Sequence, residues 1–156
     1  MLILANIIQE NIPGIQKRTD ASIRALIKSD APTNQIVFTS RALVLADRIL
    51  RRVSEVLQGG SNAVNAAESL GKDRDLFEQV LNALLRGNSR LGVTQVRNTS
   101  ALQSLGQVKS LFITIKPQIE AILNSSSDLF EVRGAADEIF LDSRVVFEEA
   151  AGLKSA

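Results

Sequence analysis

The chain has 156 residues, of which 45% are hydrophobic and 22% are charged. This length fits a single domain, and this composition is that of a globular protein rather than a disordered one. The 18 lysines and arginines nearly balance the 17 aspartates and glutamates, leaving a net charge of +1. Nucleic-acid-binding domains usually carry a strong basic excess, so we expect no nucleic-acid partner.

The sequence contains no cysteine and no histidine, which excludes several classes of site. Zinc, haem and iron–sulfur centres lose their usual ligands, and a Ser-His-Asp or Cys-His arrangement cannot form. The remaining carboxylates alternate with basic residues at helical spacing, as on a solvated helix face. We therefore expect no catalytic residue, no metal site and no cofactor, and the chain is not expected to be an enzyme.

No segment has the roughly 20 consecutive apolar residues that a membrane-spanning helix requires. The apolar opening, residues 1–8, is short and is interrupted by Asn6. It also lacks the basic start and the cleavage site of a signal peptide. We interpret it as the first turns of a packed helix.

The first predicted helix covers residues 2–28, where apolar residues recur every three or four positions. Pro13 lies inside this helix and is expected to kink it, because proline removes a backbone donor. Residues 30–33 then break the pattern, and Thr33 is a candidate N-cap for the next helix.

The second predicted helix, residues 33–58, carries the clearest apolar pattern in the chain. One seam has a residue every seven positions, Ile36, Leu43, Leu50 and Leu57, with Ala46 and Val53 three positions after Leu43 and Leu50. The first half of the helix carries a second apolar stripe: Val37, Phe38, Val44 and Leu45. This half is therefore buried on two sides or presents one side to a partner, so the stripe is a candidate packing or dimer seam. Glycines 59 and 60 end the helix.

Three further helices are predicted after the glycine pair. The third begins after Ser61, a candidate cap, and ends at residues 87–88; residues 87–98 form a connection of low periodicity. The fourth covers residues 99–124, and the serines at 125–127 predict a turn before a fifth helix whose seam begins at Leu129. Short turns make neighbouring helices antiparallel. The predicted fold is therefore all-α, an antiparallel up-and-down helical bundle of four to five helices.

A group of charged residues on the second helix is the candidate site: Arg41, Asp47, Arg48 and Arg52. Arg41 and Arg48 are seven residues apart, so they lie on one face of the helix. One interpretation is a solvated face with local ion pairs, each worth a few tenths of a kcal/mol. The other is contact with an anion or a partner, because a guanidinium presents planar donors that suit a carboxylate. The apolar stripe beside these residues adds weight to the second interpretation.

Several segments resemble a known family of sensor domains. Residues 41–50 resemble the Leu-(Ser/Ala)-(Gln/Glu)-Arg-Ile signature of the PilJ-type periplasmic sensor module, which belongs to the methyl-accepting chemotaxis-like receptor of type IV pili. The resemblance continues through residues 53–57, 66–71, 75–77, 84–88 and 128–133. It is collinear over nearly the whole chain, and this order, more than any single segment, carries the resemblance.

The resemblance implies that residues 1–156 are one sensor module, excised from the periplasmic ectodomain of a larger inner-membrane receptor. It implies a protein partner, most simply type IV pilin, and output to a cytoplasmic histidine kinase that governs twitching motility and surface sensing. Ectodomains of nitrate sensors are similar and hold the anion with an arginine at a dimer interface. Arg41 and Arg48 match the basic positions, but Asp47 replaces a neutral residue there, and its negative charge disfavours a small anion. A homodimer is left open.

Two alternatives remain at the level of the sequence. One is a receptor for a small molecule or an anion, with a pocket between helices. The other is a structural helical spacer that only transmits force or displacement.

Overall fold

The computed structural model describes the backbone of residues 2–151 and the side chains of residues 3–125. The described chain forms four helices: α1 (Leu2–Lys28), α2 (Thr33–Gln58), α3 (Ala63–Arg86) and α4 (Thr99–Ala151). Extended pairing within this range is limited to an isolated bridge between Asn88 and Val93. The predicted all-α fold is therefore confirmed. None of the helices in the described range has an apolar stretch long enough to cross a membrane.

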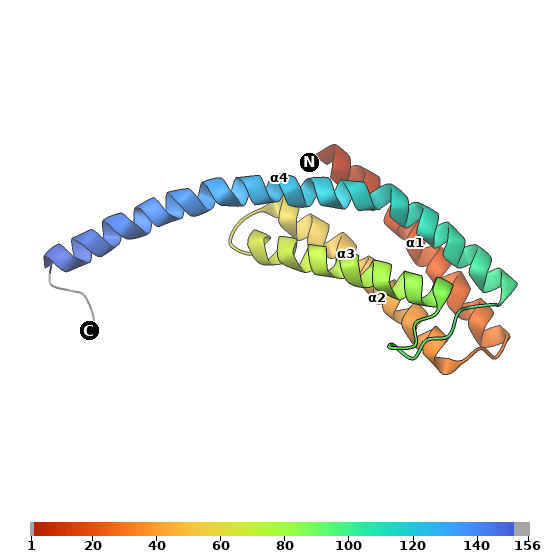
Figure 1. Cartoon of the computed structure of the whole chain (residues 1–156). Helices are drawn as coiled ribbons and strands as arrows, with labels where there is room; N and C mark the ends of the chain where they lie inside the picture. Colours follow the sequence, from red (N-terminus) through yellow and green to blue (C-terminus); the bar gives the residue numbers. More distant parts are fainter. Residues whose placement is uncertain (1, 152–156) are drawn as a thin grey trace.

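The helices run alternately up and down (Figure 1), and each packs against two others so that the four close a ring. The α1 helix packs against α2 and α4, and α3 packs against α2 and α4. The most extensive packing joins α1 to α4 and α2 to α3. The bundle can therefore be described as two helix pairs laid against each other.

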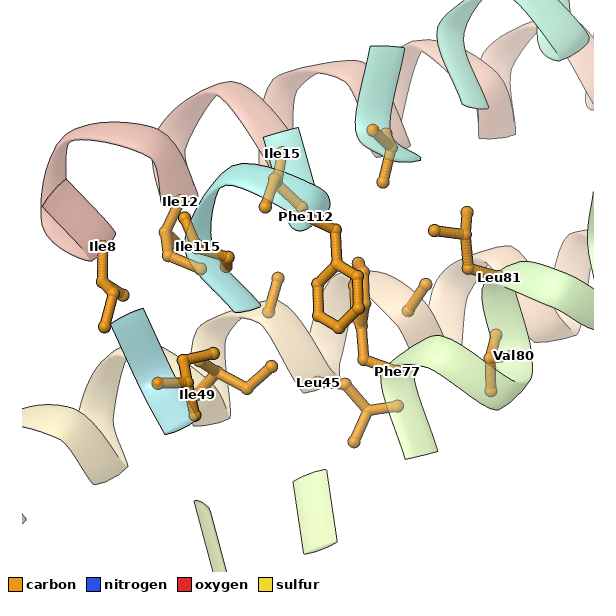
Figure 2. Close-up of a cluster of buried hydrophobic side chains, with 14 of the residues drawn as sticks. Ile8, Ile12, Ile15, Leu45, Ile49, Phe77, Val80, Leu81, Phe112 and Ile115 are labelled. Carbon is orange, nitrogen blue, oxygen red and sulfur yellow. The ribbon is translucent and has the colours of Figure 1, made fainter. Parts of the chain in front are cut away.

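The core is built from one apolar face of each helix (Figure 2). The rings of Phe77 on α3 and Phe112 on α4 lie 4.9 Å apart between their centroids, and this pair links the two helices. Burial of each large apolar side chain contributes about 1.5–3 kcal/mol. The largest fully buried side chains on α1 are Ile8, Ile12, Ile15 and Leu26.

The predicted seam of α2 is confirmed in part: Ala46 and Val53 are buried, whereas Ile36, Leu43, Leu50 and Leu57 are only half-buried and do not form the centre of the buried face. The buried apolar face instead contains Phe38, Ala42, Leu45, Ala46, Ile49, Val53 and Val56. Since α2 packs against both α1 and α3, its buried face is wide. Small alanines occupy its middle, and the larger seam residues flank it.

The turn predicted at the serines of positions 125–127 is also wrong. The α4 helix continues through them to Ala151, so four helices form instead of five, and α4 extends past the end of the bundle (Figure 1). Serine lowers helix propensity only slightly, and neither glycine nor proline stands there to stop the helix. The side-chain seam predicted to begin at Leu129 lies outside the described side chains.

The predicted glycine stops are confirmed, whereas the predicted N-caps are wrong. Gly59 and Gly87 end α2 and α3 with φ of 70° and 80°, in the left-handed region that glycine adopts without steric cost. The α2 helix begins at Thr33 itself, and Pro32 precedes it without a side-chain cap bond. The α3 helix follows Asn62, one residue after the predicted cap Ser61, again without such a bond.

The connection of residues 87–98 is fastened to the helices that it follows and covers. The Val96 backbone N–H donates to the Leu84 carbonyl at 2.9 Å, and both Val93 and Val96 are buried. On α2, the buried Gln35 amide donates to the Thr94 carbonyl at 3.0 Å. These bonds hold the connection, including Leu91, against one end of the α2–α3 pair.

Candidate functional site

A groove of about 630 Å³ lies between α2 and α3 and is closed at one end by the connection. Most of its wall is apolar: Val37, Phe38, Val44 and Leu45 come from α2, Leu76 and Val80 from α3, and Leu91 from the connection. Val37, Val44 and Leu76 are exposed by 40%, 57% and 44%. The groove therefore presents apolar side chains to solvent.

The second apolar stripe predicted on α2 forms one wall of this groove. Phe38 and Leu45 point into the core and are 8% and 7% exposed, whereas Val37 and Val44 face outward. Along a helix, residues one position apart are turned by about 100°, so adjacent apolar residues divide between core and surface. Phe38 and Leu45 are therefore core residues, whereas Val37 and Val44 remain on the surface of the groove.

Arg41 lies at the edge of the groove and is exposed. Its guanidinium carbon is 4.8 Å from the centroid of the Phe38 ring, a cation–π contact worth about 0.5–1 kcal/mol at an exposed site. Within the described residues Arg41 forms no ion pair. Its N–H donors are therefore available to an anionic group in the groove.

Arg48 also lines the groove, but unlike Arg41 it is held by an ion pair with a buried residue of α3. Its Nη2 forms an ion pair with Oδ1 of Asp73 on α3 at 3.0 Å, and the Asp73 side chain is only 1% exposed. The second carboxylate oxygen, Oδ2, has no hydrogen-bond partner in the described structure. Burial raises the pKa of Asp73 above its ordinary value, and the nearby guanidinium of Arg48 partly opposes this effect.

Asp73 was missed from the sequence, although a signal for it exists. Leu70, Asp73 and Phe77 follow the three-and-four spacing of a buried helix face, and all three are buried. The neighbouring charges at 72, 74 and 75 made residue 73 look like part of a solvated run. A carboxylate on an apolar seam requires a partner, because an unpaired buried charge is costly.

The structure separates the other two candidate residues from the groove. Asp47 pairs with Arg51 at 3.2 Å, and both side chains are more than half exposed. Arg52 pairs with Glu55 at 2.9 Å on the same helix. Exposed pairs within one helix contribute about 0.3–0.5 kcal/mol each. Arg41 and Arg48 therefore share the groove, whereas Asp47 and Arg52 belong to local ion pairs.

The groove combines apolar walls with positive charge alone, because its lining includes two arginines and neither aspartate nor glutamate. Among the described residues, no group of three or more potential metal-ligating side chains occurs. Such a surface suits a partner that is apolar in its body and anionic at its edges. The fold and the groove together define a helical bundle with an open apolar groove beside two arginines.

Comparison with known proteins identifies the family. Residues 25–137 match the family described as "PilJ: Type IV pili methyl-accepting chemotaxis transducer N-term". The chain is 35% identical over 153 residues to methyl-accepting chemotaxis AlkN of Alcanivorax borkumensis, covering 97% of this chain. It is also 35% identical over 150 residues to Protein PilJ of Pseudomonas aeruginosa, covering 96% of this chain. The chain therefore belongs to the PilJ family of N-terminal domains of chemotaxis transducers.

The chain spans less than a quarter of these relatives, 23% of AlkN and 22% of Protein PilJ. The matched range contains α2, α3 and the connection, and hence the whole groove. The resemblance inferred from the arginine-bearing segment and its collinear neighbours is confirmed.

Proposed function

We propose that this chain senses a partner or ligand as the periplasmic part of a chemoreceptor-like transducer of type IV pili, anchored in the inner membrane. The observation that carries the proposal is the family match over residues 25–137, the range that also builds the groove. The domain contributes binding rather than catalysis. The larger receptor would pass the signal to a cytoplasmic histidine kinase and so control twitching motility and surface sensing.

The partner in this proposal is type IV pilin, which contacts the α2–α3 groove. Arg41 and Arg48 would meet anionic groups of the partner, while Val37 and Val44 would cover its apolar surface. Contact at the groove would shift α3, which packs against α4. Because α4 leaves the bundle as one continuous helix, a small displacement in the bundle would move its far end (Figure 1).

Titration of the chain with purified pilin tests this proposal. Arg41→Glu should weaken binding about tenfold, since a charge-assisted contact is replaced by repulsion. Lys17→Glu is the matched control, because Lys17 is exposed on α1 outside the groove and the change in net charge is the same. Equal pilin binding by both variants and the unchanged chain would refute contact at the groove.

A second candidate function is a receptor for a small molecule or an anion, and the groove volume favours it. Ligand sites commonly measure about 300–1,000 Å³, and the groove falls in that range. A ligand that binds only the folded state raises the melting temperature, so thermal-shift screening detects it. If neither pilin nor a ligand binds, the structural spacer becomes the better account.

Sedimentation analysis of the chain determines whether it forms a homodimer.

A further inference from the structure

The spacing of the two arginines in the groove limits the kind of ligand or partner that can fill it. Arg41 and Arg48 lie seven residues apart on α2, about 10 Å along the axis at a rise of roughly 1.5 Å per residue. Val44 and Leu76, both substantially exposed, lie in the lining with them. An occupant that satisfies the whole surface needs two separate anionic groups on an apolar body.

An α-helix meets this requirement better than a molecule with one head group. The two side chains leave α2 about 10 Å apart along its axis, and one is held on the Phe38 ring and the other against Asp73, so a molecule with a single carboxylate satisfies only one of them in these positions. On a helix, residues seven apart lie on one face after two turns, with apolar residues three and four positions along between them. The lining also extends from Ile36 to Arg48 on α2, about 18 Å, which is a little more than the length of three helical turns.

We propose that the groove binds an amphipathic helix of a partner protein. Its apolar stripe packs on Val44 and Leu76, and two acidic side chains seven residues apart pair with Arg41 and Arg48. This assignment rests on the proposed function, because it specifies the chemistry of the partner at the same groove. Docking of an amphipathic helix in an apolar groove is a common mode of peptide recognition.

Asp73 acts in this proposal as a positioning residue for Arg48. Its contact with Nη2 fixes the guanidinium, while the other donors of the 39% exposed side chain remain available on the groove side. A side chain that is already ordered loses less conformational entropy on binding. Arg48 is thus prepared for an acidic partner, and Asp73 holds it without reaching the partner.

Two synthetic helical peptides test the proposal by fluorescence anisotropy with the 156-residue chain. Both carry leucines at positions i, i+3, i+4 and i+7, flanked by two glutamates seven apart in one peptide and two lysines in the other. We expect the glutamate peptide to bind at least about tenfold more tightly, as two charge-assisted pairs replace two repulsive ones. Equal binding of the two peptides would overturn the proposal. Decanoate that binds as tightly as the glutamate peptide would also overturn it, in favour of a single-headed ligand.

Variants of the chain locate the peptide on the groove. Val44→Glu should abolish most glutamate-peptide binding, whereas Val64→Glu should not, since Val64 is a similarly exposed valine outside the groove (52% against 57%). Asp73→Asn should weaken binding of the glutamate peptide. In the Arg48→Ala variant, where the arginine side chain is removed, adding Asp73→Asn should leave the affinity for the peptide unchanged. Equal losses in the two valine variants, with helical content retained, would contradict binding in the groove.

The same variants separate this proposal from the pilin contact. If the glutamate peptide binds the groove and pilin does not bind, the helix site stands and the pilin contact fails. If pilin binds equally to the unchanged chain and to Val44→Glu while neither peptide binds, the helix site fails and pilin is sensed elsewhere on the domain.

Discussion

The two helix pairs of the bundle differ in what their interfaces contain. Between α1 and α4 the described buried side chains are apolar, apart from Thr19 and Ser22, whose hydroxyls donate to carbonyls of their own helix. Between α2 and α3 a buried carboxylate, Asp73, pairs with Arg48, and a groove opens beside them. The first interface is stabilised by packing that needs no directional contact. The second combines apolar packing with one specific charge pair, which lies beside the groove.

The largest expected loss of stability is in the α1–α4 pair, whose interface is apolar. Ile115 is fully buried on α4, and Ile115→Ala removes apolar contacts and leaves a cavity. We expect the free energy of unfolding to fall by about 3–4 kcal/mol. Urea denaturation followed by circular dichroism measures this loss. The exposed neighbour Ile113 supplies the control, since Ile113→Ala should cost much less, and similar losses would mean that α4 is not packed as described.

Charge reversal in the Arg48–Asp73 pair should lower the free energy of unfolding nearly as much. Arg48→Glu places a second carboxylate against buried Asp73, and we expect a loss of about 2–4 kcal/mol, limited by the partial exposure of Arg48. Charge reversal at this position is therefore a poor test of partner binding, unlike reversal at Arg41. Arg51→Glu breaks only an exposed pair and should cost under about 1 kcal/mol.

A double substitution distinguishes the pair from the packing around it. Arg48→Leu with Asp73→Leu removes both charges and should restore stability close to that of the unchanged chain, as replacement of buried pairs by apolar residues often does. A double variant that is as unstable as Arg48→Glu would show that the charges are not the source of the loss.

The α2–α3 pair should also respond to pH through Asp73. Because burial raises its pKa in the folded state, its contribution to stability is present below the unfolded value of 3.8 and is lost as pH rises through the folded pKa. The unfolding free energy of the unchanged chain should therefore decline, relative to Asp73→Asn, as pH rises from 3.8 towards neutrality. Parallel urea titrations of both chains over this range measure the difference. A constant difference would contradict the raised pKa.

A glycine on each helix of the apolar pair gives a smaller test of close packing. A Cβ added at Gly106 on α4 meets nothing within 4 Å, so Gly106→Ala should stabilise the helix by about 0.5–1 kcal/mol. A Cβ at Gly14 on α1 would lie 3.2 Å from a Leu111 methyl of α4, so Gly14→Ala should gain less or lose stability. Differential scanning calorimetry compares the two melting temperatures, and equal gains would indicate looser α1–α4 packing.

The smallest expected effect is at Arg41. Arg41→Ala removes the contact with the Phe38 ring and should cost about 0.5 kcal/mol in stability. Arg48→Ala, seven residues along the same helix, should lower the free energy of unfolding much more, even though both arginines line the groove. Chemical denaturation of the two alanine variants side by side measures it, and equal losses would remove the distinction between an anchored and a free arginine.

Much of the local structure followed from the sequence alone. The bounds expected for the first two helices agree with α1 and α2, because apolar periodicity and glycine stops act within a few residues. The family followed from the collinear segments, and the match over residues 25–137 confirms it. The serine triplet at 125–127 was misjudged, since weak helix formers do not end a helix without a stronger stop.

The features that shape the candidate site were decided only by tertiary packing. Periodicity shows that α2 has apolar faces, but contact with both α1 and α3 determines which of them is buried and leaves Val37 and Val44 exposed. Likewise, Arg41 and Arg48 look equivalent on one helix. Asp73, 25 positions beyond Arg48 and on another helix, makes them different. Patterns within one helix do not show which residues of another helix it contacts, because burial and charge pairing arise only when the helices come together.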